Sequence, residues 1–182
     1  MDNSLKMNTR KRIETKDLVI TALLIALVYV TTNINVFIPF MGAKGGLVHL
    51  GNTALFTAAI VFGKKKGAIA GAVGMGLFDI LSAWYIWAPF TFVIRLVQGY
   101  IIGQIVYAKG KNGDSIPLNL AALIISGVWM TAGYYVTEII LYGNWLAPMA
   151  SIPGDIAQVV IGIAVSMPLS VALKKSGVLK RI

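Results

Sequence analysis

Long apolar runs alternate with short polar segments along almost the whole chain. Since a membrane-spanning helix needs about 20 apolar residues, and somewhat fewer where neighbouring helices shelter it, six runs qualify as candidate spans. They cover residues 17–38, 52–63, 67–83, 86–107, 118–142 and 152–173. The run at 52–63 is short, so either LVHL before it enters the membrane or the surrounding protein shields this helix from lipid. The pattern predicts an all-α integral membrane protein, with residues 1–182 forming a single domain of six transmembrane helices.

Composition supports a membrane protein. The chain is 57% hydrophobic and only 13% charged, which is more apolar surface than a soluble domain of this size can bury. A net charge of +9 would suggest nucleic acid as the partner of a soluble protein, but here the cations lie between apolar runs. That arrangement orients a membrane protein, so the lipid bilayer is the expected partner and nucleic acid is not.

The positions of the cations predict the orientation. Of the 16 lysines and arginines, all but Lys44 and Arg95 precede the first run, separate the second from the third or the fourth from the fifth, or follow the sixth. Cations favour the cytoplasmic side, so both termini are predicted to be cytoplasmic, with residues 1–16 as a basic N-terminal segment.

With this orientation, the polar and aromatic groups gather at the outer ends of the spans. The candidates for a binding site there are Asn33, His49, Asn52, Asp79, Trp84, Trp87, Arg95, Tyr134 and Glu138. The tryptophans could instead form an aromatic belt at the lipid headgroups. Trp84 and Trp87 flank a very short turn, which favours a pocket wall for one of them.

Ionisable side chains within spans need partners or a wet cavity. Asp79 and Arg95 are expected at similar depth, so they could form a structural ion pair, or a ligand could complete the pair. Asp155 follows Pro153 and Gly154 at a helix start, where capping of the helix is the favoured role.

Small residues spaced four apart let helix backbones approach closely. Such pairs are Ala22 and Ala26, Gly67 and Gly71, and Gly99 and Gly103. Internal packing is the default explanation, and a helix pair formed with a partner protein would use the same chemistry.

Motifs for catalysis and cofactors are missing. GKKKG at 63–67 lacks the order of a phosphate-binding P-loop, and GAVGMG at 71–76 lacks the context of a dinucleotide fingerprint. The chain has no cysteine and a single histidine, which argues against a metal site. The sequence therefore predicts no enzyme, no cofactor and no metal.

Two longer runs carry a family resemblance. The segments VHLGNTALFTAAIVFGKKKGAIAG and WAPFTFVIRLVQGYIIG, with the basic N-terminus and the Ala22/Ala26 pair, resemble the substrate-binding S component of energy-coupling factor (ECF) transporters. The resemblance covers nearly the whole chain. It is closest to the riboflavin-transporter-like branch that includes hydroxymethylpyrimidine and pyridoxine S components.

This resemblance implies a multi-pass protein of the prokaryotic cell membrane that captures one vitamin from outside. Such proteins dock on a membrane T component carrying two ATPase subunits and are thought to topple in the membrane to deliver the ligand inward. Ala22 and Ala26 would lie on the face that meets the T component. S components for nickel and cobalt have a histidine directly after the first methionine, whereas this chain begins Met1-Asp2-Asn3.

The expected ligand is pyridoxine or hydroxymethylpyrimidine, held by stacking rings and a few directional groups. Pantothenate would need a cation such as Arg95 or Lys44, and riboflavin would need a longer pocket. A structural membrane subunit without a ligand and a solitary secondary transporter are the competing hypotheses.

Overall fold

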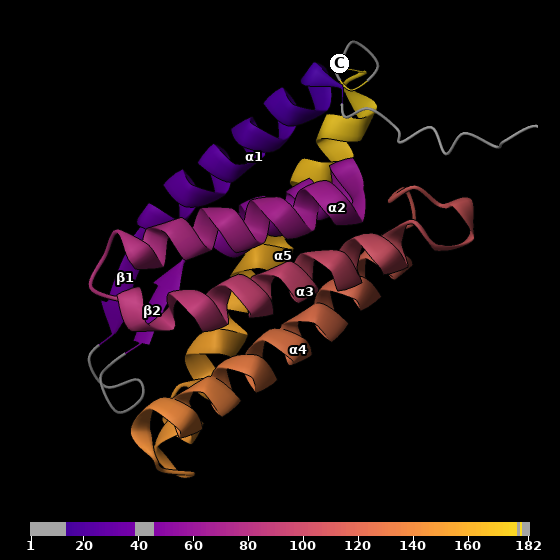
Figure 1. The fold of residues 1–182 in the computed structure, drawn as a ribbon. Helices are drawn as coiled ribbons and strands as arrows, with labels where there is room; N and C mark the ends of the chain where they lie inside the picture. Colours follow the sequence, from indigo (N-terminus) through magenta and orange to yellow (C-terminus); the bar gives the residue numbers. More distant parts are fainter. Residues whose placement is uncertain (1–13, 39–45, 178, 180–182) are drawn as a thin grey trace, which may run out of the picture.

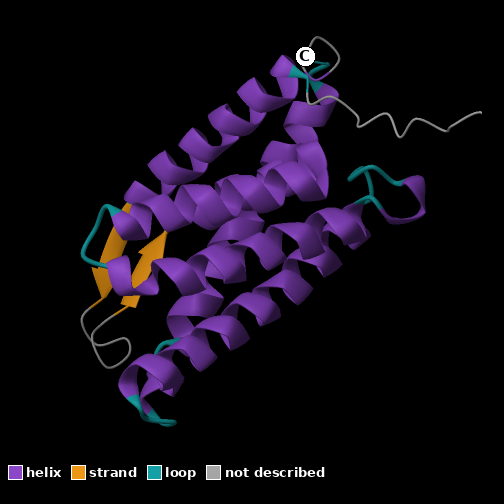
Figure 2. Ribbon diagram, in the orientation of Figure 1, coloured by secondary structure: helices purple, strands orange, loops and turns teal. Residues whose placement is uncertain are grey.

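The computed structural model describes residues 14–38, 46–177 and 179, and this part of the chain forms a bundle of long helices with a small β-hairpin at one end (Figures 1 and 2). The helices are α1 (Thr15–Asn33), α2 (Gly51–Ile80), α3 (Ala88–Val106), α4 (Ile116–Tyr142) and α5 (Ile152–Lys175). The strands are β1 (Asn35–Ile38) and β2 (Gly46–His49), and three short 3₁₀ turns are η1 (Tyr85–Trp87), η2 (Ala108–Gly110) and η3 (Ala147–Ala150).

Helix α2 folds back on itself at Gly63. This residue has φ 84° and ψ 178°, a conformation that side chains with a Cβ rarely adopt. Beyond it the two halves pack antiparallel, with Gly67 against Ala59 and Gly71 against Leu55. The predicted helices at 52–63 and 67–83 are therefore both present, joined by a sharp reversal at Gly63.

The first half of α2 forms the centre of the bundle. Every residue from Gly51 to Val61 is buried, whereas surface helices keep one face exposed. Of the two explanations for this short apolar run, shielding by protein is the one observed. The LVHL segment before it contributes to β2 and does not extend the helix.

The first predicted helix is too long at its C-terminal end. Helix α1 ends at Asn33, and Asn35–Ile38 pairs antiparallel with Gly46–His49 instead of continuing the helix. The Asn35 side chain donates hydrogen bonds to the carbonyls of Thr32 and Asn33, which offers the backbone an alternative to the helical ladder. The prediction of a helical membrane protein is confirmed, but the sequence did not predict the β-hairpin. Lys44 lies outside the described residues.

The two ends of the bundle differ in chemistry. The β-hairpin, η1 and η3 lie at one end, whereas the start of α1 lies near the C-terminal end of α5 at the other (Figure 1). At that second end Lys66 pairs with Asp17 and Lys174 pairs with Asp114.

Four helical segments are long and apolar enough to cross a membrane: α1, Tyr85–Val106, α4 and Ala147–Lys175. Each half of α2 is shorter. The six crossings and the cytoplasmic termini therefore remain predictions.

The small residues have two different environments. Gly99 packs against Ala68 and Gly103 against the backbone of Lys64, which confirms internal packing for the glycine pairs. Ala22 and Ala26 are instead exposed on the outer face of α1.

Candidate functional site

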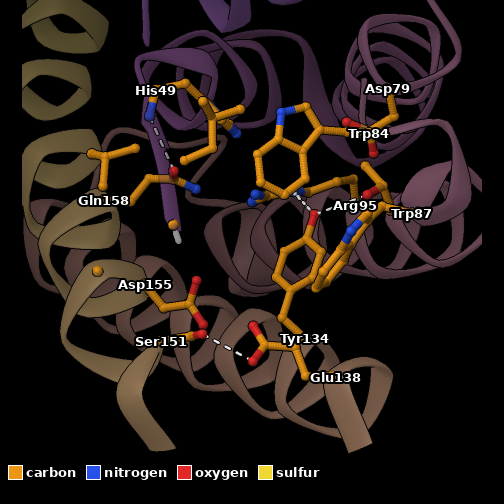
Figure 3. A pocket seen from close by; sticks show the side chains of 15 residues that line it. His49, Asp79, Trp84, Trp87, Arg95, Tyr134, Glu138, Ser151, Asp155 and Gln158 are labelled. Atoms are coloured by element: carbon orange, nitrogen blue, oxygen red, sulfur yellow. Dashed lines mark hydrogen bonds between the residues drawn. The ribbon is translucent and has the colours of Figure 1, made fainter. Parts of the chain in front are cut away.

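A cavity opens at the hairpin end of the bundle, between β2, the end of α2 with the turn after it, and helices α3, α4 and α5 (Figure 3). It contains about 680 Å³ of space free of protein atoms, counting the open space at its mouth. Its lining residues are Gly46, Leu47, Val48, His49, Asp79, Trp84, Trp87, Thr91, Arg95, Tyr134, Glu138, Ser151, Gly154, Asp155 and Gln158.

Arg95 lies at the inner wall of this cavity and is only 1% exposed. Its Nη1 donates to Asn52 Oδ1 at 2.6 Å and to Gln98 Oε1 at 2.8 Å. Its Nε donates to Tyr134 Oη at 3.1 Å, and the guanidinium lies 5.1 Å from the centre of the Tyr134 ring. These contacts hold a buried cation in one orientation.

The partners of this cation are neutral. In the described part of the chain the ion pairs are Lys66–Asp17 and Lys174–Asp114, so Asp79 and Arg95 do not form the ion pair that was one alternative from the sequence. Nη2 of Arg95 makes no hydrogen bond to a described residue. A donor is thus left at the cavity for a ligand.

Three carboxylates line the same cavity. They belong to Asp79, Glu138 and Asp155, and Ser151 Oγ donates to Glu138 Oε2 at 2.9 Å. Asp155 lies in the first turn of α5, but no side chain caps this helix among the described residues. The capping hydrogen bond expected of Asp155 is therefore not observed, although its place in the first turn suits the positive end of the helix dipole, and its side chain lines the cavity (Figure 3).

Aromatic rings form one side of the cavity. The ring centres of Trp84 and Trp87 are 6.1 Å apart, and those of Trp87 and Tyr134 are also 6.1 Å apart. Figure 3 shows these rings on one side, with His49, Gln158 and Asp155 on the other. Both tryptophans are wall residues, whereas the sequence favoured this role for one.

His49 connects the hairpin to two helices. Its backbone N–H donates to Gln158 Oε1 at 3.2 Å, and its Nδ1 accepts from the Gly51 N–H at 3.1 Å. Burial, and next the charge of Arg95, lower the pKa of His49 from 6.5 to about 3. The ring is therefore neutral at physiological pH, with its proton on Nε2.

The structure brings seven of the nine predicted site residues to the cavity. Asn52 lies behind Arg95 as a hydrogen-bond partner and is fully buried. Asn33 is outside the cavity and donates to the Tyr29 carbonyl.

Four polar residues in the cavity were not among the predicted binding residues: Thr91, Ser151, Asp155 and Gln158. Thr91 precedes Arg95 by one helical turn and Gln158 follows Asp155 by nearly one, so helical spacing could have found both. Ser151 carries no such signal.

Comparison with known proteins decides the family. The family model for the ECF-type riboflavin transporter, S component, matches residues 12–175. The chain belongs to this family. It is therefore the S component of an ECF vitamin transporter, a multi-pass protein of the prokaryotic membrane. S components are binding subunits of transporters and not enzymes, and the family implies ECF partner subunits and a vitamin substrate.

Two relatives illustrate the similarity. The chain is 28% identical over 164 residues to the thiamine precursor transporter HmpT of Lactococcus lactis subsp. cremoris, covering 90% of this chain and 91% of the relative. It is 34% identical over 145 residues to an uncharacterised protein of Pyrococcus woesei, covering 79% of this chain and 93% of the relative.

Proposed function

We propose that this S component captures a small heteroaromatic alcohol, hydroxymethylpyrimidine first and pyridoxine second, in the cavity at the hairpin end. The observation that carries the proposal is a wall of rings facing polar groups across a cavity that also exposes one arginine donor. The similarity to a thiamine precursor transporter supports the pyrimidine as the first candidate.

The donors and acceptors suit such a ligand. Hydroxymethylpyrimidine has a flat ring, an exocyclic amine that donates, ring nitrogens that accept, and one hydroxyl. The carboxylates of Asp79, Glu138 and Asp155 can accept from the amine and the hydroxyl, and Arg95 Nη2 can donate to a ring nitrogen. Trp84 or Tyr134 can stack on the ring face.

The charges argue against pantothenate. That ligand brings its own carboxylate into a cavity where three carboxylates face a single guanidinium. Like charges repel strongly in a low-dielectric site, so the pantothenate anion would bind weakly.

Delivery would follow the route that the family suggests. We propose that the S component docks on a T component through the face of α1 that bears Ala22 and Ala26, and reorients in the membrane to release the vitamin inward. The exposure of both alanines supports this face, since close contact with another helix requires small, accessible residues.

A binding panel tests the ligand assignment. Detergent-purified protein is titrated with hydroxymethylpyrimidine, pyridoxine, thiamine, pantothenate and riboflavin, with tryptophan fluorescence as the readout because Trp84 and Trp87 line the cavity. Hydroxymethylpyrimidine should bind best, with submicromolar affinity, and pantothenate should not compete.

The variant Asn33→Ala is the matched control, since this residue is polar, exposed and outside the cavity. Its affinity should equal that of the unmodified protein. Tightest binding of riboflavin or pantothenate would reject the ligand assignment. Failure of a folded sample to bind any vitamin would favour a structural subunit instead.

A further inference from the structure

A second cavity lies at the opposite end of the bundle, where α2 reverses beside the end of α3. It contains about 940 Å³ of atom-free space, counting its mouth, and it is lined by three consecutive lysines, Lys64 to Lys66. Gln104 of α3 and Tyr107, the residue directly after this helix, complete much of its wall. Nothing in the vitamin site uses these residues.

The fold builds this cavity from the reversal at Gly63. Tyr107 Oη donates to the Val61 carbonyl at 2.9 Å, and the Tyr107 ring lies beside Gly63. Gly103 lets the backbone of Lys64 approach α3 closely. The start of the second half of α2 is therefore fixed in place, and its first residues are the lysines themselves.

The charges in the cavity are strongly positive. Lys64 Nζ donates to Gln104 Oε1 at 2.6 Å and lies 5.1 Å from the centre of the Tyr100 ring, and among the described residues it forms no ion pair with a carboxylate. Lys66 is paired with Asp17 at 2.6 Å, and Asp17 is the one carboxylate among the described residues that line the cavity. Lys65 is exposed. Three cations therefore face a single anion.

The surroundings of the cavity are apolar. Ile69, farther along α2, is 42% exposed, and Tyr100, one turn before Gly103 on α3, is 49% exposed. In a membrane protein such side chains are expected against lipid tails, which would put the lysines at the level of the headgroups.

We propose that this lysine cavity binds the phosphate headgroup of an anionic phospholipid, with the acyl chains lying over Ile69 and Tyr100. Basic pockets between helices at the membrane boundary suit such headgroups, and each lysine near the surface contributes about 1 kcal/mol. The amides at the start of the second half of α2 add donors for the same phosphate. The bound lipid would anchor the reversal of α2 at this end of the bundle.

The test measures lipid binding by the full-length protein. The protein is purified in neutral detergent, and binding of phosphatidylglycerol and phosphatidylcholine is followed by native mass spectrometry. The cavity variant is Lys64→Gln/Lys65→Gln/Lys66→Gln. The matched control is Lys109→Gln/Lys111→Gln/Lys175→Gln, which removes three exposed lysines that do not line the cavity.

The unmodified protein and the control should prefer phosphatidylglycerol to phosphatidylcholine. The cavity variant should lose about a hundredfold in affinity for phosphatidylglycerol, since about 1 kcal/mol per lysine corresponds to about fivefold for each of the three. Its vitamin binding should be unchanged, because the other cavity lies at the opposite end. Should the triple variant not fold, Lys65→Gln alone should lose about fivefold.

Three results would overturn the proposal. Equal losses of phosphatidylglycerol affinity in the cavity variant and the control would mean that the lipid is attracted by the overall surface charge and not by this cavity. No preference for phosphatidylglycerol in the unmodified protein would exclude an anionic headgroup site. Equally effective competition by soluble glycerol phosphate would assign the cavity to a free phosphate compound.

Discussion

Arg95 determines much of the geometry of the vitamin cavity at the scale of single residues. Its Nε and Nη1 join Tyr134, Asn52 and Gln98, which come from three different helices, while Nη2 is left for the ligand. Removing the Arg95 side chain would leave its buried acceptors without a donor, and each unpaired acceptor would cost about 1–3 kcal/mol of stability.

The variant Arg95→Ala should lower the free energy of unfolding by about 2–4 kcal/mol and weaken vitamin binding at least about tenfold. Arg95→Lys keeps the positive charge but loses the planar guanidinium with its several donors. Its affinity for the vitamin should therefore fall between those of the unmodified protein and Arg95→Ala. Thermal unfolding and fluorescence titration measure both effects. Normal stability and affinity in Arg95→Ala would show that the arginine has no such role.

The low pKa of His49 in the fold predicts that the stability of the protein depends on pH. Because its pKa falls from 6.5 in the unfolded chain to about 3 in the fold, the unfolded state binds a proton that the folded state lacks between these values. The stabilisation from His49 is complete above about pH 6.5 and is lost as the pH falls, by at most about 1.4 kcal/mol per pH unit.

The comparison is between the unmodified protein and His49→Asn, whose amide oxygen can still accept from the Gly51 N–H. The melting temperature of the unmodified protein should fall more between pH 7.5 and pH 5 than that of the variant. Parallel curves would mean that His49 titrates normally in the fold.

Residue identity predicted seven of the fifteen residues that line the cavity, because polar groups at one end of a membrane bundle must face a cavity or one another. Residue identity did not show that Asn52 lies behind the cavity wall and not in it, since the direction of this side chain depends on how the two halves of α2 pack. The same limit applies to Asp155, whose position beside Pro153 and Gly154 favoured capping although the side chain lines the cavity.

At the scale of elements, the apolar runs predicted the long helices but neither the β-hairpin nor the three 3₁₀ turns. Residues 35–38 are apolar enough to extend the first helix, and only their pairing with residues 46–49 makes them a strand. A pattern of apolar residues does not show which segments will pair as strands, so this hairpin could not be predicted from it. The three lysines at 64–66 separate the predicted runs 52–63 and 67–83, and the reversal at Gly63 lies at the edge of this break.

The packing of the two halves of α2 can be tested with two glycines. A Cβ at Gly67 would meet the backbone of Ala59 at 2.5 Å, whereas a Cβ at Gly76 would meet Phe92 at an ordinary 3.6 Å. Gly67→Ala should therefore destabilise the protein by about 1–3 kcal/mol. Gly76→Ala should be neutral or stabilising by up to about 1 kcal/mol, since alanine favours helix. Similar melting temperatures for the two variants would contradict the fold-back.

At the scale of the whole molecule, capture and docking are separated on the surface. The vitamin cavity lies between β2 and helices α2 to α5, whereas Ala22 and Ala26 are on the outer face of α1. Ala22→Trp with Ala26→Trp should leave vitamin affinity within about twofold, the range that residues outside the cavity permit. The same variant should abolish co-purification with the T component.

A control for docking is Leu23→Trp with Leu27→Trp, which adds the same rings beside the alanines on exposed positions of α1. It should disturb co-purification less, because those positions already carry large side chains. Two results for Ala22→Trp with Ala26→Trp would contradict the separation of capture from docking. One is the loss of both vitamin binding and assembly with the T component, and the other is the loss of neither.

The most direct test of the proposed function is an experimental structure of the protein with hydroxymethylpyrimidine bound. The ring should lie in the cavity beside Trp84 or Tyr134, with a ring nitrogen accepting from Arg95 Nη2 and the amine facing Asp79, Glu138 or Asp155. A ligand bound elsewhere, or bound in the cavity without contact to Arg95 and to these carboxylates, would contradict the account.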